Sequence, residues 1–172
     1  LDNTTNDTLT LANNVDVSGA IFTVTAANVD TVIDNATVTL TDAQHETLIE
    51  NAASVSATGT ETITLSNPTS GDTGDALVAN GAVETYNLAD GGANAILLAD
   101  TGQTVNGGDN SDSITSGAGD DIIDVGNTDT SVDTVVFGSD AASNGNDTIS
   151  NFELGVGDDV LDFSANGFIG GA

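Results

Sequence analysis

Residues 107–124 read Gly107-Gly-Asp-Asn-Ser-Asp-Ser-Ile-Thr115 and then, without a gap, Ser116-Gly-Ala-Gly-Asp-Asp-Ile-Ile-Asp124. Each nine-residue unit joins a turn rich in glycine and aspartate to a short segment with a central isoleucine. The same spacing extends toward the N-terminus and connects the apolar residues Ile96, Val105, Ile114 and Ile123. A nine-residue apolar period fits neither a helix nor a simple hairpin. It predicts short strands stacked in a solenoid, in which each half-coil contributes one strand and one turn.

A second regularity is an aspartate two positions before an aliphatic residue. In the tandem units Asp112 precedes Ile114, and Asp121 precedes Ile123. Three less regular units downstream keep this pair and supply Asp133, Asp147 and Asp159. We expect the aliphatic side chain to point into the coil, while the aspartate ends the turn and aims its carboxylate at an ion. Glycines in the turns permit positive φ and let carbonyl oxygens approach the same point.

The tandem units follow the nonapeptide G-G-x-G-x-D-x-U-x, in which U is a large apolar residue, with departures at Asn110 and Ser116. Residues 102–165 therefore resemble the RTX (repeats-in-toxin) family of haemolysin-type calcium-binding proteins, which form a parallel β-roll. The resemblance implies several bound calcium ions, held by carboxylates and by the backbone of the glycine-rich turns. The residues it places at these sites are Gly107, Asp109, Asp112, Gly117, Gly119, Asp121, Asp133, Asp147 and Asp159.

In such a roll alternate repeats stack on one side at about 4.8 Å, so carboxylates from every second repeat face each other. This predicts one lane with Asp112, Asp133 and Asp159, and a second lane with Asp121 and Asp147. Unscreened carboxylates repel, and a calcium ion with six to eight oxygen ligands converts that repulsion into coordination. Extended backward, the register places the amides Asn94 and Gln103 at the same position. We therefore expect calcium ligation to begin near residue 107.

The composition narrows the possible partners. The 172 residues include 27 acidic side chains, no Lys or Arg and no Cys, which gives a formal charge of -27 at pH 7. Nucleic acids and anionic lipids are therefore improbable direct partners, and disulfides and Cys-based metal sites are excluded. No window is apolar for long enough to predict membrane insertion. The alternative without metal binding is that the Gly-Asp segments are ordinary loops and that the acidic surface only keeps the chain soluble.

Residues 1–67 alternate apolar and polar side chains and predict a β-rich N-terminal part. Thr41 with Gln44 forms a capping pattern that predicts one short helix over residues 42–52, with His45 as a solvated surface residue. A loop is expected over residues 68–80, and the solenoid over 81–172. The fold class is thus all-β. The acidic residues Asp30 and Asp34 have no repeat frame and are expected in turns or caps.

An enzyme is not expected. His45 is the sole histidine, and no G-x-S-x-G elbow accompanies it. A glycosidase cleft is usually lined by aromatic residues, and the chain offers only one Tyr and five Phe. The EF-hand pattern is missing as well.

The leading functional hypothesis is a secreted structural protein that folds and self-assembles on binding calcium, as a surface layer, filament or biofilm matrix. The alternative is a calcium-folded C-terminal module of a larger adhesin or exoenzyme. The RTX resemblance implies export by a type I route without an N-terminal signal, and hence an extracellular or cell-surface location. A third class, a carbohydrate-binding or ice-binding solenoid, is indicated by the threonines Thr37, Thr39, Thr60, Thr62 and Thr64.

Overall fold

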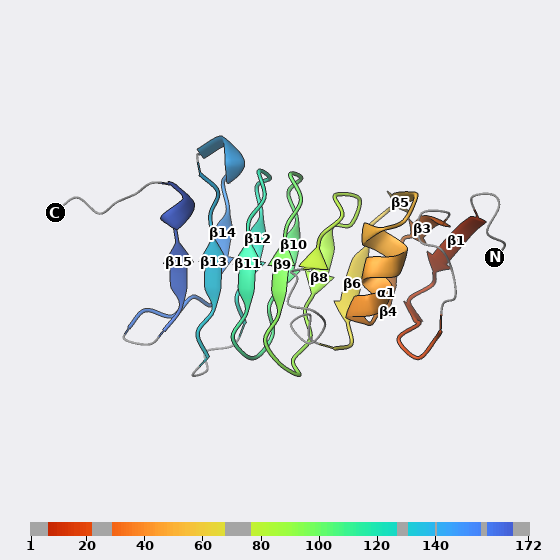
Figure 1. Ribbon diagram of the computed structural model, residues 1–172, viewed down its shortest axis with the longest axis horizontal. Helices are drawn as coiled ribbons and strands as arrows, with labels where there is room; N and C mark the ends of the chain where they lie inside the picture. Colours follow the sequence, from red (N-terminus) through yellow and green to blue (C-terminus); the bar gives the residue numbers. More distant parts are fainter. Residues whose placement is uncertain are drawn as a thin grey trace.

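The computed structural model describes residues 7–21, 29–67, 77–126, 131–139, 141–155 and 158–166. Its strands are short and stack side by side along one long axis (Figure 1). One layer is a seven-stranded sheet. Its strands, in spatial order, are β14 (Thr148–Ser150), β12 (Ile122–Asp124), β10 (Thr104–Asn106), β8 (Thr85–Asn87), β6 (Thr62–Leu65), β4 (Thr37–Leu40) and β2 (Val15–Asp16).

The opposite layer consists of two sheets. The smaller contains β1 (Asp7–Ala12), β3 (Val29–Asp34) and β5 (Ser54–Thr58). The larger runs in the order β15 (Val160–Asp162), β13 (Thr134–Val136), β11 (Ser113–Thr115), β9 (Ala95–Leu97) and β7 (Leu77–Val78). The strands pair in parallel in all three sheets, so the chain is an all-β solenoid, as predicted.

The nine-residue period places one apolar side chain at the centre of each strand. Ile96 and Ile114 are aligned in the five-stranded sheet, while Val105 and Ile123 are aligned in the seven-stranded sheet. All four side chains are fully buried. Consecutive strands therefore alternate between the two layers, and the core is a thin stack of mostly aliphatic side chains. Tyr86 continues this stack beside Val105 and is also fully buried.

The seven-stranded sheet extends into the N-terminal part, because β6 pairs with β8 as well as with β4. Residues 68–76 of the expected loop, including Pro68, lie outside the described residues. Within the remainder of that loop, β7 is a short strand that pairs with β9. The N-terminal strands thus stack on the same solenoid layer as the strands that precede the Gly-Asp repeats.

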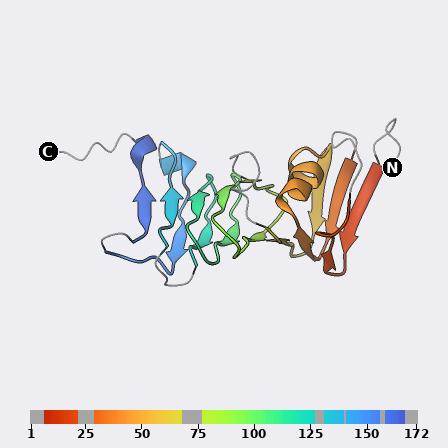
Figure 2. The same cartoon turned by 60° about the horizontal axis from the view of Figure 1, so that its bottom comes forward.

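The predicted helix is present as α1 (Asp42–His45), which continues as the π-helix η2 (Glu46–Glu50). Its N-terminus has the expected cap, in which the Thr41 hydroxyl accepts from the Gln44 amide at 3.2 Å. Two further single turns are the 3₁₀ segments η4 (Ala141–Ser143) and η5 (Ser164–Asn166). Figure 2 shows α1 and η2 as one short helical ribbon beside the N-terminal strands. The Thr31 hydroxyl of β3 donates to the Leu48 carbonyl there, at 2.6 Å.

The expectation that Asp30 and Asp34 occupy turns or caps is wrong. Both lie on β3 and point away from the core, where each carboxylate accepts a hydroxyl hydrogen bond from β5. Ser54 donates to Asp30 at 2.7 Å, and Thr58 donates to Asp34 at 2.8 Å. Aspartate has a low strand propensity, but these cross-strand hydrogen bonds offset that preference.

Candidate functional site: the stacked aspartates

The five repeat aspartates form the two predicted lanes. In the first lane each aspartate comes directly before a strand of the five-stranded sheet, and its Oδ1 accepts from a backbone N–H in the preceding coil. Asn94 donates to Asp112 at 2.7 Å, Asp112 to Asp133 at 2.7 Å, and Asp133 to Asp159 at 3.0 Å. The lane is therefore one continuous ladder of side-chain to backbone hydrogen bonds.

The second lane lies at the start of the strands of the seven-stranded sheet. The Gln103 amide donates to Asp121 Oδ1 at 2.8 Å, and the Asp121 amide donates to Asp147 Oδ1 at 3.0 Å. The prediction that Asn94 and Gln103 occupy the aspartate position in the earlier coils is confirmed by these contacts. Each aspartate thus has a structural role before any ion is considered, because its Oδ1 tethers neighbouring coils.

The second lane differs from an ordinary hydrogen-bonded turn in the environment of the other carboxylate oxygen, Oδ2, of its two aspartates. Asp121 is only 1% exposed, and Asp147 is half-buried. The Oδ2 atoms of both are buried and make no hydrogen bond of good geometry with a described residue. The Gly117 amide and the Ser116 hydroxyl are nevertheless near enough to Asp121 and Asp147, respectively, to oppose the rise in their pKa values. Burial raises the pKa of Asp121, and the neighbouring Asp147 charge adds to the rise. Burial also raises the pKa of Asp147, although its bond from the Asp121 amide opposes this. A buried carboxylate stacked against a half-buried one is stabilised by a proton or a cation.

The glycines of the turns are required by close coil stacking. A Cβ on Gly107 would lie 2.7 Å from the Val125 carbonyl oxygen and 3.1 Å from Asp112 Oδ2. A Cβ on Gly117 would overlap the backbone of Ala99, and one on Gly119 would overlap the backbone of Thr101. The turns therefore bring carbonyl oxygens against the next coil, which is what a calcium shell that includes backbone oxygens requires.

The positive φ angles fall on neighbours of the predicted glycines. Gly108 has φ +87°, and Asn110, where the repeat pattern departs from glycine, has φ +78°. Asparagine tolerates this region better than other residues with a side chain, so the substitution preserves the turn. Asp109, the remaining predicted ligand, is exposed in the same turn.

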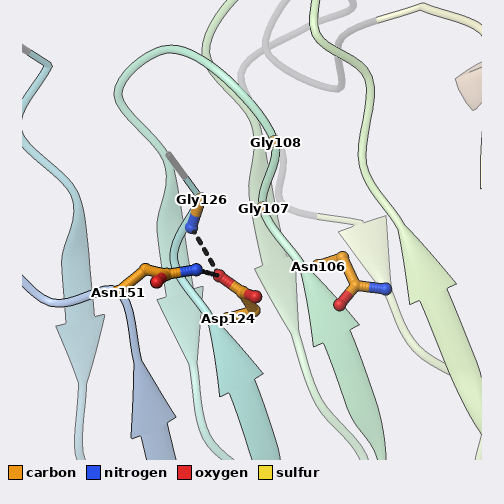
Figure 3. Close-up of a pocket in the computed structure, with 6 residues that line it drawn as sticks. All are labelled: Asn106, Gly107, Gly108, Asp124, Gly126 and Asn151. Atoms are coloured by element: carbon orange, nitrogen blue, oxygen red, sulfur yellow. Dashed lines mark hydrogen bonds between the residues drawn. The ribbon is translucent and has the colours of Figure 1, made fainter. Parts of the chain in front are cut away.

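A hollow of roughly 220 Å³ lies against the turns that follow β10 and β12 (Figure 3). It contains a carboxylate that the sequence interpretation omitted, that of Asp124. Its Oδ1 accepts from the Gly126 amide at 3.0 Å and from the Asn151 side chain at 2.8 Å. The sequence signal for Asp124 was weak, because it closes its repeat instead of preceding a strand. The hollow is lined by Asn106, Gly107, Gly108, Asp124, Gly126 and Asn151.

Within the described residues, no three His, Asp or Glu side chains gather into a group that could hold a metal. Side chains alone therefore do not complete a coordination shell in this part of the chain. An ion at either lane would need carbonyl oxygens of the glycine-rich turns and water in addition to one or two carboxylates. Calcium, with its irregular shell of six to eight oxygens, is compatible with such a mixed set.

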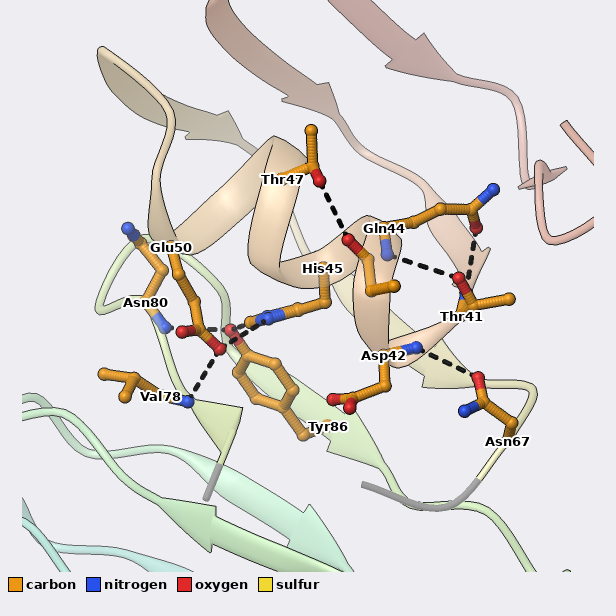
Figure 4. A network of polar contacts seen from close by, with 11 residues as sticks. Thr41, Asp42, Gln44, His45, Thr47, Glu50, Asn67, Val78, Asn80 and Tyr86 are labelled. Carbon is orange, nitrogen blue, oxygen red and sulfur yellow. Dashed lines mark hydrogen bonds and ion pairs between the residues drawn. The ribbon is translucent and has the colours of Figure 1, made fainter. Parts of the chain in front are cut away.

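His45 is the second polar group of interest, and its predicted exposure is wrong (Figure 4). The ring is fully buried, with Nδ1 3.2 Å from Glu50 Oε1 and Nε2 3.4 Å from the Tyr86 hydroxyl. The Tyr86 hydroxyl accepts from the Asn80 amide at 2.8 Å, and Glu50 accepts from the Val78 amide at 2.9 Å. This network connects the helix to β7 and β8, so its role is structural.

The protonation of this network follows from its donors. Because the Tyr86 oxygen already accepts from Asn80, its proton is free to reach Nε2, which leaves Nδ1–H to donate to Glu50. Burial lowers the pKa of His45, so the ring is neutral at pH 7. Burial would raise the pKa of Glu50, but the hydrogen bonds from His45 and Val78 outweigh it and lower that pKa.

Comparison of the chain with protein-family models, curated proteins and solved structures found no match. The fold and the stacked aspartates therefore define the class of protein on their own, a β-solenoid with two internal carboxylate ladders. Among the described residues, none of the helices is long and apolar enough to cross a bilayer.

Proposed function

We propose that this chain is a secreted structural protein whose solenoid is stabilised by calcium bound in its turns. The observation that carries the proposal is the pair of buried, unpartnered oxygens on Asp121 and Asp147 in a chain with no Lys or Arg. Because the chain has no lysine or arginine to neutralise these two carboxylates, a proton or a cation from solution must do so. The RTX-like repeats over residues 102–165 favour calcium and an extracellular location.

Self-association into a surface layer, filament or biofilm matrix is the second part of the proposal. In the last coil that the structure describes, Leu161 aligns with the fully buried Val135, yet Leu161 is 39% exposed. Val160 and Phe163 beside it are 43% and 41% exposed. A further coil from a second copy would cover these side chains. A further coil of a longer chain would cover them equally well, which is the alternative of a module within a larger adhesin or exoenzyme.

Calcium removal tests the proposal. Dialysis against EDTA at pH 7 should reduce both the β signal in circular dichroism and the resistance to urea, and millimolar calcium should restore both, because each ion removes two charges from a chain at -27. Light scattering on the same samples separates the two alternatives. An increase in particle size on adding calcium supports self-assembly of the chain. A β-rich monomer in calcium supports the alternative, a module of a larger adhesin or exoenzyme. A chain that stays equally ordered after exhaustive EDTA dialysis would disprove the calcium proposal.

A second candidate function rests on the outward face of the seven-stranded sheet. Two ranks of small polar side chains run across four neighbouring strands in parallel register. The first rank is Thr37, Thr62, Thr85 and Thr104, and the second is Thr39, Thr64, Asn87 and Asn106. Side-chain hydrogen bonds order the second rank, since Asn87 donates to Thr64 at 3.2 Å and Asn106 donates to Asn87 at 2.6 Å. Such a preorganised, uncharged array favours a regular hydroxyl-bearing surface, such as ice or a polysaccharide.

Leucine substitutions at Thr62 and Thr85 test this second candidate. They remove two central hydroxyls without changing charge, so inhibition of ice recrystallisation, or retention on a polysaccharide gel, should be lost. The matched control is leucine at Ser113 and Thr134, which are aligned in the opposite sheet. If neither ligand is bound by the unsubstituted protein, or if both variants behave alike, the array has only a structural role.

A further inference from the structure

The residues directly before the strands of the seven-stranded sheet form one continuous row. In each coil the first strand residue donates its N–H to the carbonyl of the row residue in the coil before. Thr85 donates to Glu61 at 3.1 Å, Thr104 to Glu84 at 2.8 Å, and Thr148 to Asp121 at 2.8 Å. Glu61 and Glu84 are therefore the counterparts of Asp121 and Asp147, several coils earlier and outside the Gly-Asp repeats. In chain order the row is Ala36, Glu61, Glu84, Gln103, Asp121 and Asp147.

Glu61 is a buried carboxylate with an unsatisfied oxygen. The residue is only 2% exposed, and its Oε1 is buried without a hydrogen-bond partner among the described residues. The chain contains no Lys or Arg that could pair with it. The sole histidine is also committed elsewhere, since His45 Nδ1 contacts Glu50 at 3.2 Å. An ionised carboxylate in this position must obtain its compensating charge from solution.

The neighbouring carboxylate makes the need for a cation stronger. Burial raises the pKa of Glu61, and the negative charge of Glu84 raises it further. Hydrogen bonds from the backbone amides of Thr58, Asn35 and Glu61 itself to this carboxylate act in the opposite direction, and all of these donors are uncharged. A proton on Glu61 would satisfy one carboxyl group only and would add a buried O–H that needs an acceptor. A divalent cation would neutralise both glutamates, and the exposure of Glu84 gives it an open side for water ligands.

We propose that Glu61 and Glu84 bind a calcium ion between the coils of β6 and β8. The ligand class is a hard divalent cation, because both side-chain donors are carboxylates. This site would tie together coils that the Gly-Asp repeats do not reach. The proposed site uses residues other than the repeat aspartates. An experiment can therefore disprove this site without disproving calcium binding in the repeats.

The test counts calcium ions bound to the full chain, by equilibrium dialysis with metal analysis. Glu61→Gln keeps the size of the side chain and removes its charge, and the variant should bind one calcium ion fewer than the unsubstituted protein. Glu84→Gln should lose the same ion, which keeps the test valid if Glu61→Gln does not fold. Glu46→Gln, at an exposed position on the helix, is the matched control and should bind the full number.

Each result decides the question. Loss of one ion in both variants, with the control unchanged, supports the site. An unchanged number of ions in either folded variant overturns it and indicates that Glu61 is held as a protonated acid. Absence of calcium from the unsubstituted protein overturns this site and the proposed function together, whereas retention of all ions in Glu61→Gln and Glu84→Gln overturns this site alone.

Discussion

Replacing Asp112 and Asp121 together by asparagine is expected to raise the calcium concentration at the folding midpoint by about 10- to 100-fold, the range seen when a metal ligand loses a partner. Asparagine keeps an oxygen that can accept from the Asn94 and Gln103 amides, now 2.7 and 2.8 Å from the aspartate oxygens. The coil-to-coil ladder is thus preserved, while the charge that would bind calcium is removed. A calcium titration followed by circular dichroism measures the midpoint.

The matched control is Asp30→Asn with Asp34→Asn. These aspartates point outward from β3 and accept hydroxyl hydrogen bonds from Ser54 and Thr58. The control removes the same number of charges, so any general relief of repulsion at -27 is the same in both double variants. An equal shift of the midpoint in both would mean that calcium acts by screening alone. In EDTA, the Asp112 and Asp121 double variant should be at least as stable as the unsubstituted protein, because two buried charges are gone.

The second large effect concerns the pH dependence of folding stability, which is expected to have opposite signs in the calcium-free and the calcium-loaded protein. Burial raises the pKa of Asp121 and of Asp147, so the calcium-free folded state binds protons more tightly than the unfolded state. The resulting stability is present below the unfolded aspartate pKa of about 3.9 and is lost as the pH rises through the raised folded values. Calcium-free protein should therefore become more stable on acidification. Calcium-loaded protein should become less stable, because protons compete with the ion for the carboxylates.

His45 opposes the aspartates in the calcium-free protein, over a different range of pH. Burial lowers its pKa, so its stabilising contribution is present above the unfolded value of about 6.5 and is lost as the pH falls below it. For one such group the slope is at most about 1.4 kcal/mol per pH unit. Urea denaturation at a series of pH values, with EDTA and with calcium, measures both trends. If the free energy of unfolding changes with pH in the same direction below pH 5 in EDTA and in calcium, calcium ligation by the aspartate lanes is contradicted.

The solenoid itself was predictable from local pattern. The nine-residue spacing of Ile96, Val105, Ile114 and Ile123 corresponds to four consecutive buried strand centres. Two such half-coils make one coil, so residues 18 apart stack, as Ile96 and Ile114 do. The same arithmetic separated the repeat aspartates into their two lanes. The insertions after Asp124 did not disturb the alternation, because β13 still pairs with β11 and β14 still pairs with β12.

The exposure of single polar residues was not predictable in this way. His45 was expected in solvent, because its helix could be placed on the chain but its rotation against Tyr86 could not. Glu61 carried no signal, since the residues before it lack the Gly-Asp pattern. Its burial and its closeness to Glu84 depend on strands that are far apart along the chain. Asp30 and Asp34 were assigned to turns from propensity, which cross-strand hydrogen bonds override.

The amino-acid sequence alone determined which side chains point into the coil and how often the chain turns, because a strand alternates its faces and a glycine-rich turn ends it. Its lack of Lys and Arg also determined that buried carboxylates need charge from outside. Only the tertiary structure decided which carboxylates those are. One carboxylate oxygen of each of Asp121, Asp147 and Glu61 is buried by neighbouring coils, and burial by a neighbour is a property of stacking that one strand does not encode.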